Sequence, residues 1–98
     1  MSPERTNAYR RVLNTIAELG PSKLQDVEQD RIRYAADSLI FCADLDADQA
    51  GREALVETQL MLDALVQSGR WQRATADRLA ADLRGCGPAP VPVALRAA

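Results

Sequence analysis

Helix start and stop signals recur four times along these 98 residues, and each pair of signals encloses an amphipathic stretch. Ser and Asp, which cap helix N-termini, precede the apolar-periodic segments, and Gly or Pro follows them. The apolar residues recur at three- and four-residue spacing, which places them on one side of a helix, and no strand-like alternation of useful length interrupts this pattern. The sequence therefore predicts an all-α fold, a compact bundle of four helices.

The first helix is expected to run from Ser2 to the pair Gly20-Pro21. The Ser2 hydroxyl can cap the helix, and Pro3 takes the first helical position, where a missing N–H costs nothing. At 100° per residue, the apolar side chains share one arc about 160° wide. That arc holds Tyr9, Val12, Leu13, Ile16, Ala17 and Leu19.

The second helix is expected to begin at Ser22, because Ser22 and Gln25 have the spacing of a capping box, and to run to about Leu45. In its second half, apolar residues cover all but about 100° of the helix circumference. This predicts that it is the central and most buried helix. The apolar residues are Ala35, Ala36, Leu39, Ile40, Phe41, Cys42, Ala43 and Leu45.

The third helix is expected to start where Asp44, Asp46 and Asp48 crowd together, since carboxylates favour the positive end of a helix dipole and can cap its N–H groups. It should end at Ser68-Gly69, where Gly can take the left-handed conformation. One broad face of this helix is apolar. A second apolar pair, Val56 and Leu60, lies one turn apart outside that face.

The fourth helix is expected to follow Arg70-Trp71 and to stop at Gly85. Trp71 should anchor the turn, with its ring packed and its indole N–H bonded to a carbonyl. The Gly- and Pro-rich sequence beyond cannot continue a helix. The expected organisation is a four-helix domain over residues 1–85 and a flexible, Pro-rich tail over residues 86–98. The buried stripe of the last helix should be Ala76, Leu79, Ala80 and Leu83.

Composition narrows the possible functions. Histidine is absent, which removes the commonest general base near neutral pH and every His-containing triad or metal set. The Asp and Glu residues mostly occupy expected caps or solvated faces, where nothing raises their pKa for acid–base work. We therefore expect a protein that is not an enzyme and that binds no cofactor and no metal.

The charge and the N-terminal sequence suggest a compartment and a class of partner. A net charge of −2 provides no general attraction to nucleic acid or to anionic membranes, so neither is an expected partner. The N-terminal residues contain no apolar signal-peptide region, and no apolar run approaches the roughly 18 residues of a membrane span. We expect a cytoplasmic protein.

The two cysteines cannot form a disulfide framework. Cys42 lies within the apolar arc of the second helix and is expected to be a small buried residue. Cys86 stands between two glycines at a helix end and is expected to be more exposed.

A short motif allows a carrier-protein alternative. Asp37-Ser38-Leu39 is similar to the Asp-Ser-Leu of acyl and peptidyl carrier proteins, which are small acidic four-helix bundles. The resemblance implies a phosphopantetheine group on Ser38. That family presents its serine at the start of a helix after a loop, whereas residues 33–36 read as helix leading into Ser38, which falls in the apolar arc.

Two further motifs suggest other functions. The triplet Asp44, Asp46 and Asp48 resembles the opening of an EF-hand loop, but Gln49 replaces its Gly and Leu55 replaces its closing Glu, which favours capping over calcium.

The third helix, the turn at residues 68–71 and the fourth helix could form a DNA-binding helix-turn-helix, with Arg73, Thr75 and Arg78 available to contact bases. Seven acidic residues between Asp37 and Asp63, against the single Arg52, weigh against this alternative.

The leading hypothesis is a helical protein–protein interaction module. The apolar circumference of the second and third helices exceeds what four short helices should cover, and a partner chain would remove that surface from water. The expected partner is a second copy, in a homodimer, or another protein. The expected partner-binding residues are Val56, Leu60 and Phe41.

Overall fold

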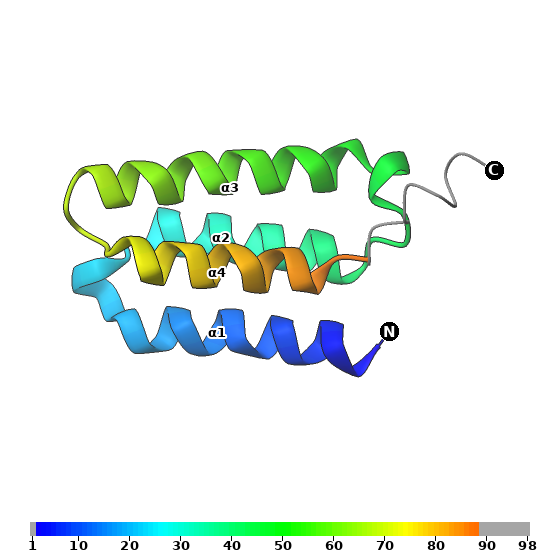
Figure 1. The fold of residues 1–98 in the computed structure, drawn as a ribbon, viewed down its shortest axis with the longest axis horizontal. Helices are drawn as coiled ribbons and strands as arrows, with labels where there is room; N and C mark the ends of the chain where they lie inside the picture. Colours follow the sequence, from blue (N-terminus) through cyan, green and yellow to red (C-terminus); the bar gives the residue numbers. More distant parts are fainter. Residues whose placement is uncertain (1, 89–98) are drawn as a thin grey trace.

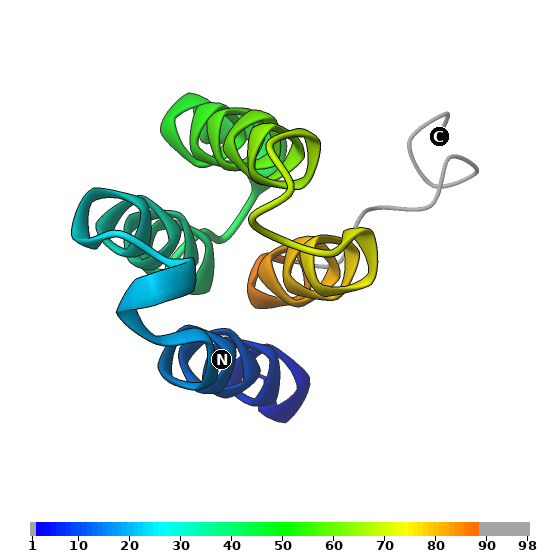
Figure 2. The ribbon, with the colours of Figure 1, turned by 90° about the vertical axis from the view of Figure 1, so that its left-hand side faces the viewer.

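The computed structural model describes residues 2–88 and contains four α-helices and no strand in that range. Consecutive helices run in opposite directions (Figure 1), and viewed end-on the four helices occupy the corners of a square (Figure 2). The predicted all-α four-helix bundle is thus confirmed. The elements are α1 (Pro3–Lys23), α2 (Asp26–Ile40), the short 3-10 helix η1 (Leu45–Ala47), α3 (Gln49–Gln67) and α4 (Arg73–Cys86).

The start of α1 follows the sequence signals. The hydroxyl of Ser2 accepts a 3.2 Å hydrogen bond from the Arg5 backbone N–H, and Pro3 opens the helix. Near the end of α1, Gly20 leaves helical geometry with φ 69° and ψ 177°. This region of backbone conformation is essentially restricted to glycine. The predicted break at Gly20 is present, and one further turn follows it, up to Lys23.

Two predictions about the second helix are wrong. It begins at Asp26, and the reciprocal cap involves Gln25, whose backbone N–H donates to Glu28 Oε1 at 2.9 Å. Ser22 belongs instead to the turn that follows Gly20, because the chain re-enters helical geometry there. The helix ends at Ile40, and Leu45 lies in η1.

Consequently, α2 is not the central helix of the bundle. It occupies one corner of the square, as each of the other helices does (Figure 2). The second helix was expected to be apolar around most of its circumference because residues 41–45 were included in it. These residues lie beyond the end of α2. Within α2 the buried side chains form one stripe: Ile32, Ala35, Ala36, Leu39 and Ile40.

Two of the three carboxylates before α3 act as caps, as predicted: Asp44 caps η1 and Asp48 caps α3. The Asp44 side chain accepts from the backbone N–H of Asp46 at 3.0 Å, and Asp48 accepts from that of Gly51 at 2.9 Å. At the other end of α3, Gly69 has φ 81°, as expected for a left-handed helix terminator.

The end of α4 differs from the prediction. The helix continues through Gly85 to Cys86, and the Cys86 side chain is fully buried, so the expectation of an exposed Cys86 is wrong. Helical geometry at Gly85 turns the next residue toward the core. The predicted flexible tail falls mostly on residues 89–98, which lie outside the described residues. The predicted buried stripe of α4 is confirmed: Ala76, Leu79, Ala80 and Leu83.

Trp71 closes the end of the bundle where α3 turns into α4. It is 5% exposed, and its indole N–H donates to the Lys23 carbonyl at 2.7 Å, as predicted. The guanidinium of the neighbouring Arg70 forms a bidentate ion pair with the Glu28 carboxylate, with N–O distances of 2.8 and 2.9 Å. These contacts tie the turn to both α1 and α2.

Candidate functional site

The two apolar residues that the helical pattern placed outside the core face of α3 are exposed in the structure. Val56 is 60% exposed and Leu60 is 64% exposed. Their side chains are one turn apart in the middle of α3, and the described part of the chain does not cover them. Exposed apolar side chains grouped in this way are typical of a protein–protein contact.

An open groove runs beside this pair, between α3 and α4. It has a volume of about 300 Å³. Leu55 is half-buried and contributes to its apolar lining, and Arg84 of α4 forms its opposite wall. The groove therefore offers an apolar depression that is accessible to another chain. It is lined by Leu55, Val56, Gln59, Leu60 and Arg84.

Phe41 does not join this groove. It lies at the C-terminal end of α2 and is 80% exposed, the highest exposure among the large apolar side chains of residues 2–88. Of the three predicted partner-binding residues, the structure therefore brings two together and leaves the third at a separate place.

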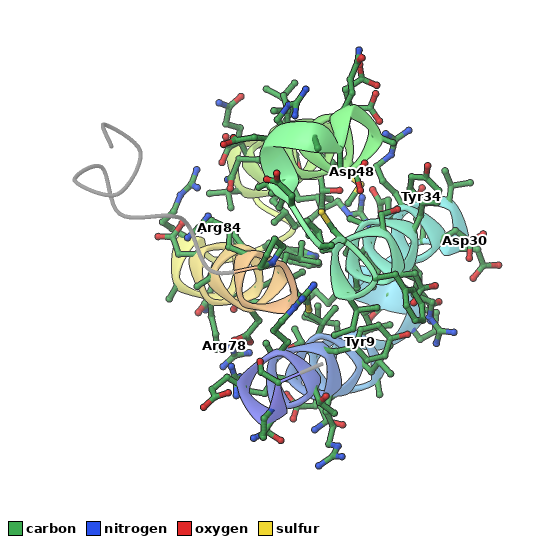
Figure 3. All side chains as sticks on the ribbon, turned by 90° about the vertical axis from the view of Figure 1, so that its right-hand side faces the viewer. Tyr9, Asp30, Tyr34, Asp48, Arg78 and Arg84 are labelled. Atoms are coloured by element: carbon green, nitrogen blue, oxygen red, sulfur yellow. The ribbon has the colours of Figure 1, made fainter. Side chains whose placement is uncertain are left out.

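A second exposed region was missed in the sequence analysis. Val27 is 72% exposed and Tyr34 is 60% exposed, both on α2. Figure 3 shows Tyr34 and Asp30 projecting outward from α2. The signal was present in the sequence, because Val27, Tyr34 and Phe41 are spaced seven residues apart and so return to nearly the same side of a helix.

A groove of about 320 Å³ separates this region of α2 from α3. The Arg31 guanidinium and the Glu57 carboxylate pair across it at 3.1 Å. Thr58 is 1% exposed, and its hydroxyl has no hydrogen-bond partner among the described residues. Such an unpaired buried hydroxyl is uncommon in folded proteins. The groove is lined by Val27, Asp30, Arg31, Tyr34, Ala54, Glu57 and Thr58.

Charge is divided between two halves of the bundle. Residues 24–69, which contain α2 and α3, hold ten acidic and three basic side chains. By contrast, α1 and α4 together hold seven basic and four acidic side chains. In Figure 3, Arg78 and Arg84 project from α4, on the side of the bundle away from Tyr34 and Asp30. The acidic half is also the half with the exposed apolar residues.

The two thiols and the phenol of Tyr9 are held in their neutral forms. Burial raises the pKa of Cys86 to about 11. Burial, followed by a hydrogen bond to Asp48, also raises the pKa of the Cys42 thiol. The phenol of Tyr9 donates to Asp37 at 2.5 Å, and this bond raises the Tyr9 pKa. Neither thiol is therefore an activated nucleophile at neutral pH.

The structure places Ser38 in the last turn of α2, half-buried, with helix on its N-terminal side. The serine of carrier proteins lies at the start of a helix, so this position does not reproduce the arrangement that the Asp37-Ser38-Leu39 triplet suggested.

The helices α3 and α4 lie side by side in opposite directions (Figures 1 and 2). In a helix-turn-helix the two helices cross at roughly 90–120°. Arg73 is engaged with Asp63 at 2.9 Å and with Asp77 at 3.4 Å. This geometry gives no support to the DNA-binding alternative.

Comparisons of the chain with protein-family models, with curated proteins and with solved structures found no match. Within residues 2–88, no helix is both long enough and apolar enough to cross a membrane.

Proposed function

We propose that this chain is a non-enzymatic helical interaction module that associates with a second copy of itself through the outer side of α3. The observation that carries the proposal is the exposure of Val56 and Leu60 beside an apolar groove. In a two-fold pair with the two α3 helices antiparallel, Val56 of one copy packs against Leu60 of the other.

The energetics favour a weak dimer. Burying a fully exposed Val or Leu contributes about 1.5–3 kcal/mol, and these side chains begin about 60% exposed. The four side chains of a symmetric pair therefore contribute on the order of 4–7 kcal/mol. This is near the lower bound of the roughly 4–15 kcal/mol cost of association. We expect dimerisation that depends on concentration.

Salt should strengthen this dimer. The interface lies in the half of the bundle with ten acidic and three basic residues, so two copies repel one another as they approach. Added salt screens repulsion between exposed charges. The dimer fraction is therefore expected to rise with ionic strength.

The test is sedimentation or light scattering at micromolar to millimolar concentration, on the original protein and on the variants Val56→Glu and Leu60→Glu. Each variant should remain monomeric where the original protein dimerises. Ala81→Glu, an equal change of charge at an exposed position of α4, serves as the control and should dimerise normally. A protein that stays monomeric throughout, or a dimer that is indifferent to both α3 variants, contradicts the proposal.

A further inference from the structure

A stripe of alternating apolar and acidic residues runs along the outer side of α2. Val27, Tyr34 and Phe41 are spaced seven residues apart, and Asp30 and Asp37 follow the first two of them by three residues. Residues at this spacing lie along one side of a helix. Phe41 is the residue that directly follows α2 and its backbone is still near helical geometry (φ −97°, ψ 0°), so it extends the stripe by one position. From Val27 to Phe41 the stripe is about 21 Å long, at 1.5 Å per residue. Its three apolar members are 60–80% exposed.

The stripe borders the groove between α2 and α3, and two features of that groove point to an occupant. Its inner wall includes the buried Ala54 and Thr58, and the Thr58 hydroxyl has no partner among the described residues. At its rim, Asp30 makes no hydrogen bond or ion pair with any described residue. A basic side chain of a partner can reach Asp30 directly, because Asp30 is exposed at the rim, whereas the Thr58 hydroxyl is closed off from solvent and would be reached only if the wall of the groove opened.

The charge around the stripe selects a basic occupant. Residues 24–69 carry a net charge of −7, and two of their three basic side chains are already engaged. Arg31 pairs with Glu57, and Arg52 donates to the Leu45 carbonyl at 2.7 Å and to the Asp46 carbonyl. A partner with Lys or Arg beside its apolar residues complements this surface in charge and in hydrophobicity.

We propose that the α2 stripe and the adjoining groove bind a basic amphipathic helix of another protein. Apolar residues of the partner, at helical spacing, pack on Val27, Tyr34 and Phe41, and its basic residues meet Asp30 and the neighbouring carboxylates. This site is separate from the α3 surface proposed for self-association.

A second copy of this chain is a poorer occupant of the stripe. The acidic half of one copy repels the acidic half of another. The half formed by α1 and α4 has a net charge of +3, but none of the exposed large apolar side chains of residues 2–88 lies on it. It therefore lacks the apolar contacts that the stripe needs.

The test uses a fluorescent, amidated helical peptide of Leu, Ala and Lys, about 18 residues long to span the stripe at 1.5 Å per residue. Anisotropy measures its affinity for the full chain, and amide chemical shifts locate the binding site. A second peptide carries Glu in place of every Lys. We expect the basic peptide to bind, with shifts centred on α2 and the groove, and to weaken as salt is added. The acidic peptide should not bind.

Two charge reversals provide matched variants. Asp30→Lys should weaken binding of the basic peptide about tenfold, because it places a cation where the partner's cation lies. Glu18→Lys makes the same change of charge on the exposed side of α1 and should leave the affinity unchanged. Val56→Glu and Leu60→Glu should also retain binding even where they abolish dimerisation, so the two proposals succeed or fail independently.

Several outcomes would overturn this assignment: equal binding of both peptides or of neither, chemical shifts on α1 and α4, or equal losses in Asp30→Lys and Glu18→Lys. If Asp30→Lys alters dimerisation instead of peptide binding, the occupant of the stripe is a second copy and the proposal is wrong.

Discussion

The side chain of Arg5, in the first turn of α1, donates a 2.8 Å hydrogen bond from Nε to the backbone carbonyl of Cys86, the last residue of α4. The same guanidinium donates from one terminal nitrogen to three carbonyls at the end of α2, those of Leu39, Ile40 and Cys42, at 2.7, 3.2 and 2.7 Å. The last carbonyls of a helix have no partner within the helix. Arg5 therefore caps two helix ends and holds them beside the start of α1.

Replacing Arg5 by Ala should lower the free energy of unfolding by about 2–4 kcal/mol, because hydrogen bonds from a charged donor are worth about 1.5–3 kcal/mol and several carbonyls lose their partner. Urea denaturation measures the change. Arg10→Ala, at an exposed position of the same helix, should stay within about 0.5 kcal/mol of the original protein. Equal effects of the two substitutions would show that the carbonyl contacts contribute nothing.

The cysteines should resist alkylation in the folded protein. Both side chains are buried, and burial raises both thiol pKa values, that of Cys86 to about 11. The thiolate is the reactive form, so iodoacetamide at pH 8 should leave the native chain unmodified and label both cysteines in denaturant. Intact mass reports the number of added groups. One group added rapidly to the native protein would contradict the burial of one of the two thiols.

The high pKa of Cys86 should also make the folded protein less stable at alkaline pH. A folded-state pKa of about 11, above the ordinary 9.0, means that folding favours the protonated thiol. Its contribution to stability is complete below pH 9 and is lost as the pH rises toward 11. The Cys86→Ala variant should not show this contribution, so its free energy of unfolding should fall less than that of the original protein as the pH rises toward 11.

The ion pair of Glu28 and Arg70 should make stability sensitive to acid. The two hydrogen bonds from Arg70 hold the pKa of Glu28 below its ordinary 4.5. Its contribution to stability is therefore complete above pH 4.5 and is lost as the pH falls through the lower folded-state value. Glu28→Gln should cost roughly 1–2 kcal/mol at pH 7, and the difference from the original protein should shrink below pH 4.5.

A matched control for this pair is Glu57, which pairs with Arg31 at the surface, where the two side chains are 61% and 45% exposed. Exposed ion pairs contribute little, so Glu57→Gln should change the free energy of unfolding by less than about 0.5 kcal/mol at either pH. Thermal unfolding at pH 7 and at pH 3.5 measures both variants. A constant penalty for Glu28→Gln at both pH values would contradict the assignment.

The number of helices, the starts of α1, α3 and α4 and the end of α3 could be predicted from the sequence because the signals are local. Ser2, Asp48 and Gly69 act through backbone groups only a few residues away. The end of α2 could not be predicted, because apolar residues at helical spacing continue past Ile40 and contain no signal for the turn that follows it. The burial of Cys86 depends on the core that it shares with residues of the other helices, which are distant in the sequence.

The two exposed apolar surfaces, on α3 and on α2, also differ in how far they could be predicted from local sequence. The exposure of Val56 and Leu60 could be predicted because they interrupt the polar side of an otherwise regular helix. The α2 stripe was missed because aspartates alternate with its apolar residues, so no short window contains an apolar cluster. The groove beside it forms only when α3 packs against α2, which places Thr58 and Tyr34 in the lining of the same groove.

Thr58 offers a test of whether its buried hydroxyl is kept for binding. A buried hydroxyl without a partner costs desolvation energy that an apolar group of similar shape avoids, so Thr58→Val should raise the free energy of unfolding by about 1 kcal/mol. The same variant should weaken binding of the basic helical peptide if a side chain of the partner reaches the hydroxyl. Thr15→Val is the control, because Thr15 is 5% exposed on α1 and its hydroxyl is not among the buried unpaired atoms of residues 2–88. A Thr58→Val protein that is less stable than the original would show that the hydroxyl is hydrogen-bonded in solution, and the groove would lose its unpaired polar group.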